Sequence, residues 1–226
     1  MLDYIWSTKQ PGLTVLTEDE YREELKCDDP EIAERAFNKA WEARNFEIEM
    51  YWKRATYFWA FIASTFVGYF ALVGSDNYQK HDNYAHVDVY IIICIGFVLS
   101  YAWLLTNIGS KSWQRHWEVH VDLLEDKFTG PLYKIVHPKE TYSVSKINEI
   151  VSAVFTAVWL LLGFKYLAEQ NLLNVYSSLN NINWFVVVTS VLSVLAVVSM
   201  TKGHGRGKFS DRVVKMHKRN VVYASG

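Results

Sequence analysis

Four apolar stretches, each about as long as a lipid bilayer is thick, constrain this chain more than any other feature. They cover residues 56–75, 88–109, 149–168 and 182–200, and a helix needs roughly 20 apolar residues to cross the hydrocarbon core. The alternative is a water-soluble bundle, but its helices rarely stay apolar on every side. The sequence therefore predicts an all-α membrane protein with four transmembrane helices.

The basic residues between these stretches predict the orientation of the chain. The chain divides into N-terminal helices at 1–55, spans one and two at 56–109, a helical middle segment at 110–148, spans three and four at 149–200, and a basic tail at 201–226. Lys and Arg number eight in the first of these parts, six in the middle segment and seven in the tail. The loop between spans one and two has only Lys80, and the loop between spans three and four has none. By the positive-inside rule both termini and the middle segment are cytoplasmic.

The first span is expected to begin far outside the membrane. Asp29 can cap a helix, Pro30 suits its first position, and no Gly or Pro follows until Gly68. One unbroken helix over 30–75 is therefore predicted. Outside the membrane it carries an apolar stripe that needs a partner, either the middle segment or a neighbouring subunit: Ile32, Ala36, Ala40 and Trp41.

Two shorter helical segments are expected beside this long helix. Upstream, Thr17 and Glu20 fit a capping box. The middle segment opens with a helix over 110–128 that can extend the second span, and Gly130 with Pro131 ends it. Its apolar face follows helical spacing: Trp113, Trp117, Val121, Leu124 and Phe128.

The spans and their borders offer three features. Ionisable groups are almost absent from the span interiors, which disfavours an ion-coupled transporter. Small residues at four-residue spacing in span one favour a helix–helix contact, within or between subunits: Ala60, Ser64 and Gly68. Basic side chains are expected at the lipid headgroups, and the tail lacks the glycine spacing of a phosphate-binding loop: Lys53, Arg54, Lys202, Arg206 and Lys208.

The run WQRHWEVHVD at 113–122 is the main candidate for chemistry. His116 and His120 are one turn apart and could both bind zinc, but no third ligand stands nearby, so we expect no metal. Arg115 and His120 resemble the R-x4-H signature of HEPN ribonucleases, in which a histidine transfers a proton and an arginine holds the phosphate. The competing interpretation is the polar flank of an amphipathic helix whose Trp113 and Trp117 face the core.

Two runs carry a family resemblance. ARNFEIEMYWKRATYFWAF at 43–61 and SWQRHWE at 112–118 resemble the RipA family of oligomeric bacterial inner-membrane proteins. They are also similar to the HEPN-like membrane accessory protein of type VI-B CRISPR systems. The resemblance covers about residues 28–128. It implies an octameric pore beside an RNA-cutting effector, with Arg115 and His120 as the R-x4-H pair. The two further spans and the basic tail lie outside it.

The expected protein is therefore a homo-oligomer of the bacterial inner membrane with both termini inside. It would act as a pore or membrane-perturbing effector in antiphage defence or stress, without a cofactor. Its expected partners are membrane lipids and RNA or an RNA-targeting defence effector. Arg115 and His120 would serve assembly, gating or RNA sensing, and Trp113 and Trp117 would pack their helix. A membrane-anchored HEPN-type ribonuclease and a structural membrane scaffold remain alternatives.

Overall fold

The computed structural model describes residues 16–80, 83–135, 142–169, 183–202 and 205, and every regular element in these ranges is helical. The elements are α1 (Glu18–Glu24), α2 (Pro30–Val73), α3 (Asp76–Gln79), α4 (Asn83–Leu124), the 3-10 helix η1 (Glu125–Lys127), α5 (Val144–Glu169) and α7 (Trp184–Lys202). Four of them, α2, α4, α5 and α7, are long and apolar enough to cross a membrane. The predicted all-α, four-span fold is confirmed.

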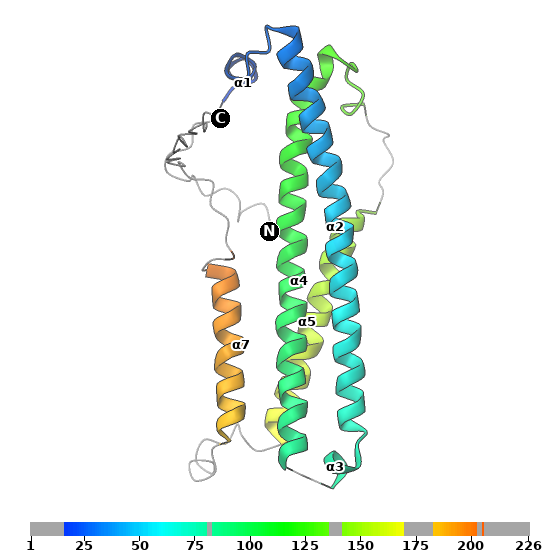
Figure 1. Ribbon diagram of the computed structural model, residues 1–226, viewed down its shortest axis with the longest axis vertical. Helices are drawn as coiled ribbons and strands as arrows, with labels where there is room; N and C mark the ends of the chain where they lie inside the picture. The colour runs from blue at the N-terminus through cyan, green and yellow to red at the C-terminus, as the bar shows by residue number, and fades with distance from the viewer. Residues whose placement is uncertain (1–15, 81–82, 136–141, 170–182, 203–204, 206–226) are drawn as a thin grey trace, which may run out of the picture.

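Two of the four helices continue far beyond the other two. Figure 1 shows α2 and α4 side by side over the full length of the molecule, whereas α5 and α7 accompany them along the lower part only. At 1.5 Å per residue, the part of α2 at 30–55 extends about 40 Å past its apolar half. We call the four-helix part the bundle. The remainder, made of α1, residues 30–55 of α2, 110–124 of α4, η1 and 128–135, is called the arm.

The predicted helix starts are confirmed by their hydrogen bonds. The Thr17 hydroxyl accepts from the backbone N–H of Glu20, and the Glu20 carboxylate accepts from the N–H of Thr17, which completes the capping box of α1. The Asp29 carboxylate accepts from the N–H of Glu31 at 2.9 Å and caps α2, with Pro30 at its first position. The α2 helix then runs unbroken to Val73, because the sequence offers no interruption.

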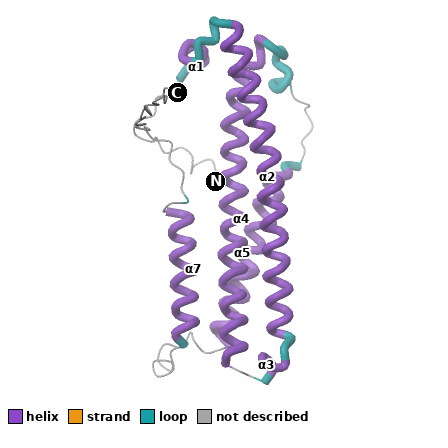
Figure 2. Tube along the Cα trace, viewed as in Figure 1, coloured by secondary structure: helices purple, strands orange, loops and turns teal. Residues whose placement is uncertain are grey.

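The bundle is organised around α4. Its Gly96 faces the indole of Trp159 on α5, and this ring is fully buried. Ser100 on α4 and Ser152 on α5 are also fully buried, so small side chains bring the two helices together. On the other side, the Tyr90 hydroxyl and the Ser190 hydroxyl of α7 form a 2.7 Å hydrogen bond. The α7 helix is peripheral (Figure 2): Val186 is its one buried residue.

The arm has its own apolar core, in which α4 is the partner that the stripe on α2 requires. The buried residues come from both helices and from the turn before α2: Cys27, Ala33, Phe37, Ala40, Val121 and Leu124. Phe37 stacks on Phe128 with ring centroids 5.3 Å apart. The predicted stripe is confirmed at Ala40, which is buried, and at Ala36 and Trp41, which pack against the same core. Ala33 and Phe37 are buried as well, whereas Ile32 is only half-buried.

Candidate functional site

The R-x4-H pair lies in the arm, on the last turns of α4. Arg115 is exposed, and its guanidinium makes no ion pair with any described residue. His120 is half-buried against α1. Five residues on a helix correspond to one turn and a further 140°. The two side chains therefore leave α4 in different directions, and one chain alone does not place them around a common substrate.

His120 is held by Tyr21 of α1. The Tyr21 hydroxyl lies 2.6 Å from Nδ1 of His120, across 99 residues of sequence. Burial, and then the thiol of Cys27, raises the pKa of Tyr21 to about 12. The phenol therefore keeps its proton at neutral pH and can donate it to Nδ1 of a neutral imidazole, whose own proton then lies on Nε2.

The environment of His120 favours its neutral form. Burial lowers the pKa of His120 below its ordinary value of 6.5, and the neighbouring His116 lowers it further. The two imidazole centroids are 4.7 Å apart, and the ring of Trp117 lies 5.4 Å from that of His120. The neutral form avoids the cost of burying a charge. Its one lone pair, on Nδ1, accepts from Tyr21, so His120 could act as a general base only after that hydrogen bond is broken.

The position of Tyr21 depends on how α1 is fixed to the rest of the arm. The Lys127 ammonium donates to the carbonyl of Cys27 at 3.1 Å. Arg22 lies 3.8 Å from the Asp126 carboxylate. Glu125 is fully buried, and its carboxylate accepts from the backbone N–H of Tyr133 at 2.9 Å. These contacts join α1, η1 and the segment after it into one unit around the end of α4.

The two tryptophans beside the pair have different surroundings. Trp117 packs against the core of the arm. Trp113 is 43% exposed, and on its turn of α4 the buried side chain is Gln114. The Trp113 ring lies 5.6 Å from that of His116. Trp113 and Arg115 are thus both on the surface of a single chain, where another molecule can reach them.

The small residues of α2 do not all share one contact. Gly68 faces α4: a Cβ added there would lie 3.0 Å from Cδ1 of Ile92. Ala60 and Ser64 are exposed on α2, and the Ser64 hydroxyl donates to the Ala60 carbonyl at 2.9 Å. Gly68 therefore serves packing within the chain, and the other two lie on an outward face.

The basic residues at the end of the bundle are partly paired. Lys53 lies 2.6 Å from Glu49, one turn earlier on α2. Arg54 donates to the Ser110 hydroxyl of α4 at 2.7 Å and lies 3.6 Å from Glu47. Lys202 is the last residue of α7 and is exposed. Arg206 and Lys208 lie outside the described residues.

A buried polar network at the boundary of bundle and arm was missed by the sequence analysis. The Asn148 amide donates to the Tyr51 hydroxyl at 2.8 Å and to the Asn107 carbonyl at 3.3 Å. Asn107 in turn donates to the Ser152 hydroxyl at 3.2 Å. This network joins α2, α4 and α5 without a formal charge, so a search for charges within the spans does not find it.

Metal ligation finds no support in the part of the chain that the structure describes. No group of three or more His, Cys, Asp or Glu side chains gathers there in a way that could hold a metal ion. His116 and His120 together supply two nitrogen ligands, and Nδ1 of His120 is already engaged by Tyr21.

These features define a class: a four-span helical membrane protein whose first two spans extend into a long helical arm. The chain belongs to the octameric membrane protein family (8xMP), whose model matches residues 34–168. The match includes α3, α4, α5 and most of α2. It therefore extends past the predicted limit at 128 and takes in the third span, while α1 and α7 lie outside it. Neither the curated proteins nor the solved structures gave a match. The family makes this chain a subunit of an oligomeric membrane protein.

Proposed function

We propose that the protein assembles as a ring of eight subunits in the bacterial inner membrane and acts as a pore or membrane-perturbing effector in antiphage defence or stress. The family match over the first three spans carries this proposal. A ring requires that each subunit bind the next through two different surfaces. The outward apolar faces of α2, α5 and α7 offer such surfaces, with large exposed side chains such as Phe61, Phe164 and Leu192.

In the proposed ring the termini and the arms lie in the cytoplasm, because the basic residues concentrate there. Lys53, Arg54 and Lys202 then lie at the level of the inner headgroups. The arms stand around the axis like a collar about 40 Å tall. Any control of the membrane part by a cytoplasmic partner must pass along α2 and α4, because these helices join the two parts.

We assign Arg115 and His120 to assembly, gating or RNA sensing at this collar. The exposed guanidinium of Arg115 has the chemistry to bind a phosphate of RNA or a carboxylate of a neighbouring arm. His120 acts differently: its hydrogen bond with Tyr21 forms only when α1 is docked on α4. The pair thus combines a contact residue with a residue that senses the state of the arm.

The proposal is tested by induced expression in bacteria with a dye that reports membrane potential. The wild-type chain should depolarise the cells, and Arg115→Ala and His120→Ala should weaken this effect. Arg35→Ala is the matched control, because Arg35 is an exposed arginine of the arm that pairs with Glu31, one turn away on the same helix. If both Arg115→Ala and His120→Ala leave depolarisation and assembly at the wild-type level, the assigned role is wrong.

The same variants separate the alternatives. A HEPN-type ribonuclease requires two R-x4-H elements from two chains and cleaves RNA without metal. Purified protein that still cleaves RNA after His120→Ala would refute it, because the proton-transfer group would be gone. A structural scaffold predicts no depolarisation by the wild-type chain at all.

A further inference from the structure

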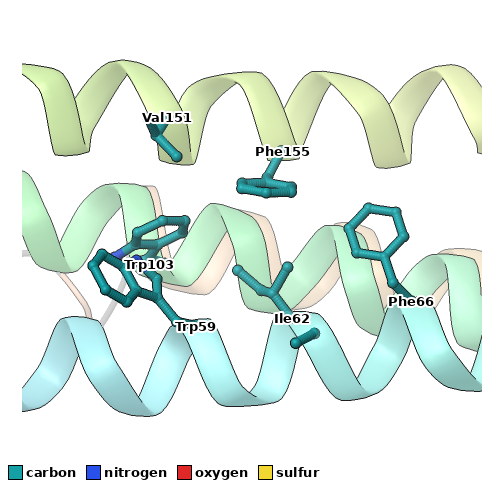
Figure 3. Close-up of a pocket in the computed structure, with 7 residues that line it drawn as sticks. Trp59, Ile62, Phe66, Trp103, Val151 and Phe155 are labelled. Atoms are coloured by element: carbon teal, nitrogen blue, oxygen red, sulfur yellow. The ribbon is translucent and has the colours of Figure 1, made fainter.

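An apolar groove opens on the side of the bundle between α2 and α5. Figure 3 shows side chains of these two helices facing each other across it, with Trp103 of α4 behind them. The cavity has a volume of about 240 Å³. Its lining consists of Trp59, Ile62, Ala63, Phe66, Trp103, Val151 and Phe155.

The groove is closed at both ends and open at its side. Towards the arm, the hydrogen bond between Tyr51 and Asn148 joins α2 to α5. Towards the other end, Phe66 stacks on Trp159 with ring centroids 4.4 Å apart. Between these closures Trp59 and Ala63 are exposed on the surface of the chain. A molecule can therefore enter sideways, from whatever surrounds the bundle.

The surroundings and the lining select the occupant. The groove lies within the apolar halves of helices able to cross a membrane, where the surrounding medium is lipid hydrocarbon. Its lining side chains offer almost no polar surface, so neither a headgroup nor an ion would be bound there. A space of 240 Å³ holds about eight methylene-sized groups, at the ~30 Å³ that a water-sized group occupies.

A neighbouring subunit is the competing occupant, but the size of the groove disfavours it. One turn of a helix with its side chains, 5.4 Å long and 10–12 Å across, occupies roughly 400–600 Å³, more than the 240 Å³ of the groove. An unbranched chain fits such a space and restores the dispersion contacts that the lining lacks when nothing fills it. We propose that the groove binds one acyl chain of a membrane phospholipid. This inference does not depend on pore activity.

Photolabelling in the intact oligomer tests the proposal. The full chain is reconstituted into phosphatidylcholine vesicles that contain a trace of the same lipid with a diazirine on one acyl chain. After illumination, labelled residues are mapped by mass spectrometry. Trp103 should be labelled although it is 1% exposed, because it lines the groove. Trp159 is the internal control: it is equally buried but does not line the groove.

A substitution that fills the groove gives the second arm of the test. Ala63→Phe should lower the labelling of Trp103 about tenfold, equivalent to ~1.4 kcal/mol of lost occupancy. Ala157→Phe is the matched control, because Ala157 is exposed on α5 and is absent from the lining. It should leave the labelling of Trp103 unchanged. Ala63→Leu adds less volume and serves as the test if Ala63→Phe fails to assemble. It should give a normal oligomer mass and an intermediate loss of Trp103 labelling.

Two results would overturn the proposal. If Trp103 is labelled no more than Trp159, the groove is closed to lipid. A neighbouring subunit seated over the groove would have this effect. Labelling of Trp103 that persists at the wild-type level in both Ala63 variants would mean that the label reaches this residue by another route.

Discussion

Gly96 on α4 makes the sharpest stability prediction, because a larger side chain has no room there. A Cβ added to Gly96 would lie 2.5 and 2.6 Å from Cδ2 and Cζ2 of Trp159, and its closest approach is to Cε2. Carbon atoms normally pack at about 3.5–4.0 Å. The indole cannot retreat easily, because it is fully buried and Phe66 stacks on it. Gly96→Ala should therefore force α4 and α5 apart.

The magnitude follows from two opposing effects. Overpacking a core costs about 1–3 kcal/mol, and the rigid ring places this site at the upper end. Replacing Gly by Ala within a helix returns about 1 kcal/mol. We expect a net loss of about 2 kcal/mol in the free energy of unfolding. Gly109→Ala is the control on the same helix: no atom lies within 4 Å of its added Cβ, so it should gain about 1 kcal/mol.

The assay is thermal unfolding of the two variants in one detergent, followed by loss of monodisperse protein. The expected difference of about 3 kcal/mol corresponds to a separation of roughly 6–12 °C between their midpoints, with Gly96→Ala the lower. Equal midpoints for the two variants would refute the close packing of α4 on α5, and with it the arrangement of the bundle.

Three further predictions test the arm and the boundary network. The pKa of His120 lies below 6.5 in the folded arm, so below pH 6.5 the unfolded chain binds more protons than the folded chain. The stability of the arm should therefore decrease as the pH is lowered. His120→Gln should flatten this pH dependence of the free energy of unfolding in urea, and an unchanged slope would contradict the assignment. Asn148→Ala removes the amide that donates to the Tyr51 hydroxyl and to the side-chain oxygen of Asn107. It should lower the free energy of unfolding by about 1–3 kcal/mol, measured by thermal unfolding. A loss near zero would show that the network contributes nothing. Glu125→Gln should keep the hydrogen bond to the N–H of Tyr133 and fold normally, whereas Glu125→Leu should cost about 1–3 kcal/mol, and equal stability of the two variants in a urea titration would contradict this role.

Local patterns explain what the sequence could predict. The cap at Asp29 and the capping box at Thr17 depend on residues within one turn of one another, and each span depends on one continuous stretch of about 20 apolar residues. The long helix over α2 followed from the lack of a breaker between Pro30 and Gly68. Each of these features can be read in one dimension, and the structure confirms them.

Pairings between distant segments could not be predicted in the same way. Tyr21 and His120 are 99 residues apart, and nothing near either residue indicates the other. Gly96 on α4 was missed for the same reason. Its importance comes from the ring of Trp159 on α5 that it faces, and helix rotation decides which neighbour a small residue meets. Helix rotation also brings Ala33 and Phe37 into the buried stripe of the arm beside the predicted Ala40.

The mass of the detergent-extracted protein shows whether the chain forms a ring of eight. We expect native mass spectrometry, or light scattering corrected for bound detergent, to give eight times the 26.2 kDa of one chain. A dimer would contradict it, because eight spans would leave too little room around an axis for a ring, and would favour the paired R-x4-H elements of a ribonuclease instead.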